Sequence, residues 1–204
     1  SDGRPECVDY RETAPAEIDR AAFSVRKSSH SYRSVGIPGT IRGLAMAHAK
    51  HGIIPWNLLV APAADLAEKG VVVDRFLARS INLVLRKTEE DANDACADLH
   101  RVYGKPGGGP WSPGDRLKLP DLAKTLRRIA ANGPDDFYRG ATAKRILAEI
   151  RRGDGLINSR DLSSYKAISR DVVSGSYRGY TIHGAPPASS GGICVIQTLN
   201  ILEQ

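Results

Sequence analysis

The sequence has few cysteines and few aromatic residues. Its three cysteines, Cys7, Cys96 and Cys194, lie far apart among 204 residues, and no two of them form a Cys-x-x-Cys pair. This spacing excludes a zinc ribbon and a thioredoxin-type redox motif, so each cysteine is expected to be a small, buried, apolar residue. No run approaches the eighteen or so consecutive apolar residues of a transmembrane helix, and no basic-then-apolar leader opens the chain.

Positive charge is in modest excess. Lys and Arg number 29 against 23 Asp and Glu, which gives a formal net charge of +6 and an isoelectric point near 9.3. The basic pairs at residues 127–128, 144–145 and 151–152 are expected on separate helical stretches, and only 6% of residues are aromatic. Nucleic-acid-binding domains concentrate charge on one face, often with interleaved aromatics. We therefore expect a solvated basic surface and no nucleic-acid partner.

Apolar periodicity and turn residues predict many helices, with strands near both ends of the chain. The predicted helices cover residues 16–23, 40–50 with Thr40 as N-cap, 56–70 with a break near Pro62, 74–85 with Asp74 as N-cap, 91–102, 120–132, 135–153 and 193–202. Residues 6–10 are predicted to form a strand, and residues 172–177 and 180–183 a hairpin. Because strands and helices do not alternate, the pattern favours an α+β fold whose sheet takes strands from distant parts of the sequence.

The sequence pattern at both ends of the chain indicates a piece of a longer protein. The turn at residues 2–5 enters a strand at once, which leaves a hairpin without its first arm. The helical periodicity of residues 193–202 continues to the last residues without a cap. We therefore expect residues 1–204 to form a single incomplete domain.

Arg11 is the candidate binding residue, although its local pattern has two interpretations. It follows the first predicted strand and precedes Glu12, so it could simply form a surface ion pair. A guanidinium is also well suited to bind a carboxylate, because its fork matches the two oxygens and its charge persists at any working pH. His48 and His51 lie three residues apart, but no acid or third ligand accompanies them, so a structural role is predicted and no metal site.

Ser189-Ser190-Gly191-Gly192 is a glycine-rich turn before a predicted helix. Such a turn can bind an anion at the helix N-terminus. The segment lacks the lysine of a P-loop, and the chain has no Gly-x-Ser-x-Gly motif. The sequence therefore predicts a turn from strand to helix with a serine N-cap.

Two blocks near the ends of the chain resemble the heavy-subunit portion of γ-glutamyltranspeptidases, also called glutathione hydrolases. The first is Asp-Tyr-Arg-Glu-Thr-Ala-Pro at 9–15, and the second combines Tyr-Arg-Gly-Tyr at 177–180 with Pro-Pro-Ala-Ser-Ser-Gly-Gly at 186–192. Further matches at residues 36–39, 122–126 and 137–140 follow in the same order. The chain departs from the family at Ala188, where a third proline is frequent, and at Asp171, where a proline commonly follows the arginine.

The resemblance implies a helix-rich part of the αββα sandwich of N-terminal-nucleophile hydrolases. It places the binding of the substrate's α-carboxylate on Arg11, with Glu12 orienting it, and assigns no catalytic residue and no metal ligand to residues 1–204. In this family, a threonine exposed by self-cleavage of a precursor attacks the γ-glutamyl amide and forms an acyl-enzyme without a cofactor. Glutathione or another γ-glutamyl molecule is the implied donor, and water, an amino acid or a peptide is the acceptor.

The resemblance also implies a light subunit from the same precursor and an exported or membrane-facing protein. Residues 1–204 contain no match to the threonine-containing cleavage motif, so this chain alone is expected to be inactive. Two alternatives stay open at this point. The protein could be a related acylase or a poly-γ-glutamate-processing enzyme, or it could be a non-catalytic homologue that acts as a binding module.

Overall fold

The computed structural model describes residues 3–19, 31–89 and 96–203. The chain groups into two compact units. Unit 1 comprises Ser1–Glu12, Gly39–His51 and Lys166–Gln204, and unit 2 comprises Thr13–Pro38 and Gly52–Tyr165. The single incomplete domain that the sequence indicated stays a prediction.

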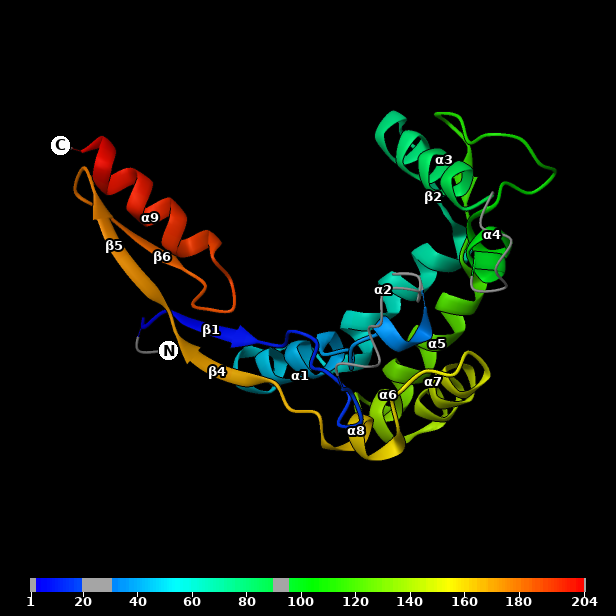
Figure 1. Ribbon diagram of the computed structural model, residues 1–204, viewed down its shortest axis with the longest axis horizontal. Helices are drawn as coiled ribbons and strands as arrows, with labels where there is room; N and C mark the ends of the chain where they lie inside the picture. The colour runs from blue at the N-terminus through cyan, green and yellow to red at the C-terminus, as the bar shows by residue number, and fades with distance from the viewer. Residues whose placement is uncertain (1–2, 20–30, 90–95, 204) are drawn as a thin grey trace. The chain divides into compact units, whose positions relative to one another are not determined.

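Unit 1 joins the beginning of the chain to its last forty residues through a pair of strands. β1 (Glu6–Asp9) pairs antiparallel with β4 (Ile168–Asp171), with Glu6 opposite Asp171 and Asp9 opposite Ile168. Figure 1 shows the two strands side by side, with α1 (Thr40–His51) next to them. The expectation that strands from distant parts of the sequence would pair is confirmed.

The rest of unit 1 is a hairpin covered by a helix. β5 (Val173–Tyr177) and β6 (Tyr180–Gly184) are joined by Arg178 and Gly179, whose φ angles are 46° and 81°. Two left-handed residues give a hairpin turn that matches the twist of the strands. α9 (Gly191–Leu202) lies along the hairpin (Figure 1), and Gly175 permits this packing because a Cβ there would lie 2.4 Å from Cγ2 of Ile196.

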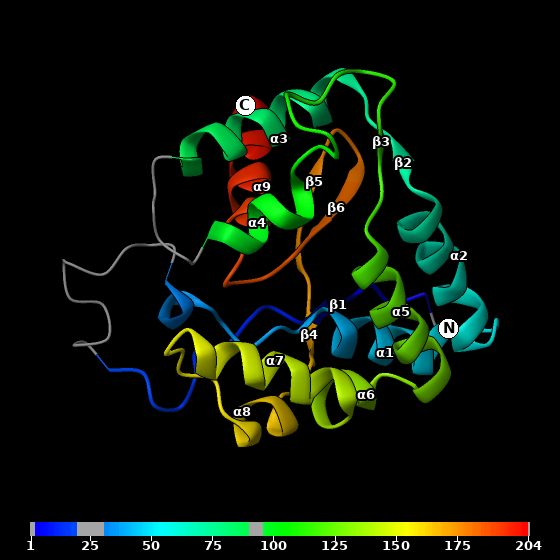
Figure 2. The ribbon, with the colours of Figure 1, turned by 90° about the vertical axis from the view of Figure 1, so that its right-hand side faces the viewer.

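In unit 2, two antiparallel helices carry one part of the core. α2 (Trp56–Lys69) packs along α5 (Pro120–Asn132), as Figure 2 shows, and the Trp56 indole donates a hydrogen bond to the Ile129 carbonyl at 3.0 Å. The short helices α6 (Asp135–Arg139) and α8 (Ser159–Ser164) flank α7 (Ala141–Arg152). Ile129, Tyr138 and Leu162 are almost completely buried here, so this helical layer forms a true hydrophobic core.

A second hydrophobic cluster in unit 2 surrounds Trp111. Its buried members are Val73, Ala78, Trp111 and Leu117. Ala78 lies in α3 (Arg75–Glu89), and Val73 follows the two-residue strand β2 (Val71–Val72). Leu117 lies in the strand β3 (Arg116–Leu117), which pairs with β2, and Trp111 lies in the loop before β3. The Trp111 indole donates to the carbonyl of Tyr103, the last residue of α4 (Ala97–Tyr103), at 2.7 Å. The short strands β2 and β3 were missed by the sequence analysis because two residues give no periodicity.

Several helix ends follow their capping residues. The Asp74 carboxylate accepts the backbone N–H of Leu77 at 2.7 Å, which confirms the predicted N-cap of α3. Pro120 opens α5, and Gly133 ends it with a φ of 78°. Asn158 is the N-cap of α8 and forms a complete capping box with Asp161.

Other predicted boundaries were wrong. α2 continues through Pro62 without a break, because the remainder of the helix packs on α5. The helix predicted over 135–153 is two helices separated by Gly140, where a Cβ would lie 2.5 Å from the Asp136 carboxylate. Thr40 is the first helical residue rather than the cap, since the Gly39 carbonyl accepts the N–H of Gly43.

Three further expectations were wrong or only partly described. Ser190 occupies the N-cap position of α9, but its side chain makes no capping hydrogen bond. Residues 16 and 17 form a turn and residues 18 and 19 are irregular, so no helix begins here, and the rest of the helix predicted over 16–23 lies outside the described residues. Cys96 is buried as predicted, whereas Cys7 is partly exposed and Cys194 is exposed on α9. Within the described ranges, no helix is long and apolar enough to cross a membrane.

Candidate carboxylate-binding site at the end of β1

An ion cluster joins the beginning of β1 to the end of α1. The Glu6 carboxylate contacts the Lys50 ammonium and lies 3.1 Å from Nε2 of His51. The hydrogen bond from Lys50, followed by that from His51, lowers the pKa of Glu6 to about 2. Glu6 is therefore ionised at neutral pH, and His51 has a structural contact, as predicted for it.

A close contact with α1 then fixes Tyr10. Gly43 is the one buried residue that α1 contains, and a Cβ built on it would lie 2.2 Å from Cγ and Cδ1 of Tyr10. The aromatic ring therefore rests directly on the helix backbone. Because any other side chain at position 43 would displace the ring, this glycine determines how β1 approaches α1.

The backbone of Arg11 is fixed by the residue two positions before it. Oδ1 of Asp9 accepts the Arg11 N–H at 3.1 Å, and Oδ2 of Asp9 accepts a hydrogen bond from Nε of Arg170 at 2.6 Å. These contacts, the Arg11 N–H first, lower the pKa of Asp9 below its ordinary value. Asp9 is thus an anion that connects the end of β1 to the neighbouring strand β4.

The side chain of Arg11 lies at the surface of unit 1. Its exposed fraction is 62%, and its Nε lies 3.5 Å from Oε1 of Glu12, whose side chain is 60% exposed. The predicted pairing of the two residues is therefore present, and Glu12 lies where it can orient the guanidinium. Because most of the Arg11 side chain is exposed, its guanidinium can donate hydrogen bonds to the carboxylate of a ligand.

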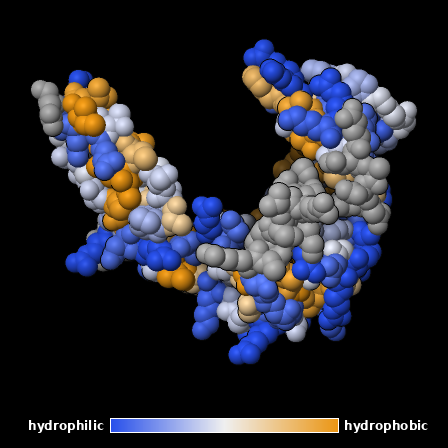
Figure 3. All heavy atoms as spheres, in the orientation of Figure 1, coloured by the Kyte–Doolittle hydropathy of each residue, from blue (hydrophilic) through white to orange (hydrophobic). Residues whose placement is uncertain are grey.

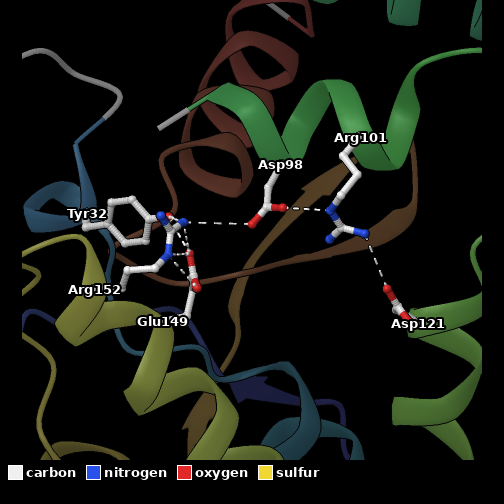
Figure 4. Close-up of polar contacts among 6 residues, drawn as sticks. All are labelled: Tyr32, Asp98, Arg101, Asp121, Glu149 and Arg152. Atoms are coloured by element: carbon white, nitrogen blue, oxygen red, sulfur yellow. Dashed lines mark hydrogen bonds and ion pairs between the residues drawn. The ribbon is translucent and has the colours of Figure 1, made fainter. Parts of the chain in front are cut away.

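A second polar cluster lies within unit 2 and connects four elements. Figure 4 shows its members, which come from the 3-10 helix η2 (Tyr32–Ser34), α4, α5 and α7: Tyr32, Asp98, Arg101, Asp121, Glu149 and Arg152. No motif or spacing in the sequence indicates this cluster, because its members are scattered between residues 32 and 152.

The chemistry of this second cluster is structural. The Tyr32 hydroxyl donates to Glu149 at 2.5 Å, and Nη2 of Arg152 lies 2.6 Å from the same carboxylate. The hydrogen bond from Arg152, followed by that from Tyr32, lowers the pKa of Glu149 to about 2, whereas the bond to Glu149 raises the pKa of Tyr32. Neither group can exchange a proton near neutral pH, so the cluster braces the helices and is a poor acid–base site.

Unit 2 also contains a cavity of about 490 Å³. It lies beside the Trp111 cluster, and Arg101, Trp111, Arg116 and Lys118 are among the residues that line it. Neither Arg11 nor Glu12 lines this cavity. Among the described residues, no group of three or more His, Cys, Asp or Glu side chains could hold a metal ion.

Comparison with known proteins decides the family. The family model described as Gamma-glutamyltranspeptidase matches residues 1–204, the whole chain. The chain belongs to the γ-glutamyltranspeptidase family. This membership confirms the resemblance that the blocks at residues 9–15 and 177–192 indicated, although the role of Arg11 stays a prediction.

Individual relatives agree with this family. The chain is 39% identical to a glutathione hydrolase proenzyme of Escherichia coli K12, over 98% of this chain and 35% of that protein. It is 35% identical to an acylase ACY 1 proenzyme of Pseudomonas sp. V22, over all of this chain and 38% of that protein. The chain thus spans little more than a third of the length of these relatives.

A solved structure supports the fold. The γ-glutamyltranspeptidase of Pseudomonas nitroreducens, determined in complex with L-DON, matches all of this chain with a TM-score of 0.86 and 34% sequence identity. The match covers 60% of that chain. It confirms the predicted fold class, a helix-rich α+β part of an N-terminal-nucleophile hydrolase.

Proposed function

We propose that the full-length protein containing this chain is a γ-glutamyltransferase or glutathione hydrolase. It would cleave γ-glutamyl amide bonds through a γ-glutamyl-enzyme and transfer the group to water or to an amino acid or peptide. Family membership supports this proposal, as does the relative in Escherichia coli that is named a glutathione hydrolase proenzyme. Glutathione or a similar γ-glutamyl molecule is the proposed donor.

The observation that carries the proposal is the state of Arg11. Its backbone is held by Asp9, while its side chain stays 62% exposed beside Glu12. A fixed backbone with an accessible fork is what binding of an α-carboxylate requires, because two parallel N–H···O bonds form only in a narrow range of orientations. We therefore assign Arg11 to the α-carboxylate of the γ-glutamyl group.

The proposal is tested by Arg11→Lys in the full-length protein. The substitution keeps the charge but removes the bidentate fork, and disruption of a desolvated charge pair typically costs about 2–5 kcal/mol. We expect a sharp rise in KM for γ-glutamyl-p-nitroanilide. Arg79→Lys, on α3 in unit 2, is the matched control and should leave KM unchanged. Equal kinetics for Arg11→Lys and the parent protein would remove Arg11 from the site.

A light subunit from the same precursor is the proposed partner. The face of α9 visible in Figure 3 is rich in apolar side chains, and Val195, Ile201 and Leu202 are each at least half exposed. Exposed apolar area of this kind supports a covering partner. The proposed threonine nucleophile would come from that subunit, so residues 1–204 alone should be inactive. Turnover of γ-glutamyl-p-nitroanilide by the purified 204-residue chain would contradict this.

An acylase is the second candidate function. It is favoured by the relative named acylase ACY 1 proenzyme, which is 35% identical over all of this chain. An acylase whose substrate lacks an α-carboxylate would not need the Arg11 guanidinium for substrate binding. If the full-length protein hydrolyses an N-acyl substrate without that carboxylate, and does so equally well with Arg11→Lys, the acylase is the better assignment.

We also propose that the full-length protein is exported (periplasmic, extracellular or membrane-facing), a property that rests on the family resemblance alone. Cell fractionation with an antibody against this chain tests it. Recovery in the periplasm, medium or outer membrane face is the expected result, and recovery in the cytosol alone would contradict the proposal.

A further inference from the structure

Asp9 uses both oxygens of its carboxylate to join Arg11 to the neighbouring strand. Oδ1 accepts the backbone N–H of Arg11 at 3.1 Å, and Oδ2 accepts from Nε of Arg170 at 2.6 Å. The Asp9 side chain is only 25% exposed, compared with 62% for Arg11. The anchored part of this group is therefore the carboxylate of Asp9, and the accessible part is the guanidinium of Arg11.

The strand register explains why Arg170 reaches Asp9. In the β1–β4 ladder, Arg170 lies opposite Cys7, and Ile168 lies opposite Asp9. Side chains two positions apart on a strand share a face, so Arg170 and Asp9 are diagonal neighbours on the same face of the sheet. Long side chains span this diagonal. The contact is a product of the pairing itself, which fixes Asp9 from a strand about 160 residues away.

The other contact of Asp9 sets the direction of the chain after β1. A carboxylate that accepts the N–H two residues later closes an Asx-turn, which holds the intervening backbone in one conformation. The ring of Tyr10, between the two residues, packs against Gly43 of α1. The segment that leads into Arg11 is therefore restrained by two independent contacts.

We infer that Asp9 is a positioning residue for Arg11: together with Arg170 it aims the guanidinium that binds the substrate's α-carboxylate. This inference rests on the proposed function, since it takes the role of Arg11 from there. The depressed pKa of Asp9 supports it, because the carboxylate stays ionised, and so keeps both hydrogen bonds, at any pH at which the enzyme would work.

Steady-state kinetics of the full-length protein with γ-glutamyl-p-nitroanilide test the inference. Asp9→Ala removes both hydrogen bonds and should raise KM about tenfold or more, with kcat nearly unchanged. Asp9→Asn retains an oxygen that can accept the Arg11 N–H and should raise KM less. Arg170→Gln should also raise KM, to an extent between that of the parent protein and that of Asp9→Ala. Asp171→Asn, which removes the carboxylate that follows Arg170 on β4, is the matched control and should not change KM.

A double-variant comparison separates positioning from a general structural role. If Asp9 acts through Arg11, Asp9→Ala should raise KM in the parent protein but add little in an Arg11→Lys background. An equal fold-change in both backgrounds would overturn the inference. So would a lower melting temperature of Asp9→Ala at unchanged KM, because a purely structural residue behaves in that way. If Asp9→Ala does not fold, Asp9→Asn and Arg170→Gln carry the same comparison.

The same measurements distinguish this inference from the proposed function. A raised KM for Arg11→Lys with parental KM for Asp9→Ala would overturn only the role of Asp9. Unchanged KM for Arg11→Lys would overturn the assignment of Arg11 itself, and with it the positioning role. A raised KM in both single variants, with no further rise in the double variant, is the result that we expect.

Discussion

Replacing Gly43 with alanine is the sharpest test of how α1 supports the candidate site. Two effects oppose each other at this position. Alanine in the middle of a helix is favoured over glycine by roughly 0.5–1 kcal/mol, because glycine loses more backbone entropy on folding. The new Cβ would, however, lie 2.2 Å from Cγ and Cδ1 of Tyr10 and 2.5 Å from its Cβ.

The steric effect should outweigh the helix propensity. Carbon atoms in contact are about 3.5–4.0 Å apart, so the Tyr10 side chain must move by more than ~1 Å to make room. Forcing an extra methyl group into a close contact costs typically about 1–3 kcal/mol. The expected net result is a destabilisation of about 0–2.5 kcal/mol, together with a displaced Tyr10 next to Arg11. Since a misplacement of about 1 Å can reduce a rate ~100-fold, we expect a larger effect on kcat/KM than on stability.

The assay compares Gly43→Ala with Gly191→Ala in the full-length protein. Gly191 is also a helical glycine of unit 1, but the nearest atom to a Cβ there is Oγ of Ser189 at 3.7 Å, an ordinary contact. Melting temperature and kcat/KM for γ-glutamyl-p-nitroanilide should fall for Gly43→Ala and stay level or rise for Gly191→Ala. If both variants behave alike, the contact between Tyr10 and α1 does not determine the site, and the reasoning is refuted.

Two further predictions concern buried and ionised carboxylates. Asp136 is buried and accepts the N–H of Ala141 at 3.1 Å, so Asp136→Ala should lower the opening free energy of α7 by about 2–4 kcal/mol, measured by hydrogen exchange of the α7 amides. The exposed Asp135→Ala is its control, and similar exchange in both variants would contradict the stabilising role of Asp136. In the folded protein, the pKa of Glu6 is lowered from its ordinary value of 4.5 to about 2. Its contribution to the free energy of unfolding is therefore complete above pH 4.5 and is lost as the pH falls toward 2. Glu6→Gln should therefore flatten the acid side of a melting-temperature profile, and an unchanged slope would show that the contact with Lys50 contributes nothing.

Local signals in the sequence predicted elements where the cause was local. The cap at Asp74 and the turn at Arg178 and Gly179 follow from the nearest few residues, and the structure confirms them. The predictions of a helix break near Pro62 and of an unbroken helix through Gly140 were wrong. The packing of α2 on α5 keeps the helix intact at the proline, and the close approach of the Asp136 side chain separates α6 from α7 at the glycine. Both outcomes depend on tertiary contacts, which no short window of sequence contains.

The same division applies to the candidate site. The sequence by itself determined the family and, through the Asp-x-Arg-Glu block, the residue to which carboxylate binding is assigned, because a motif is a property of neighbours in the chain. Only the tertiary structure brought Arg170 to Asp9 and Gly43 to Tyr10. Strand register and helix approach decide such contacts, since each joins residues that lie more than thirty or more than one hundred and fifty positions apart.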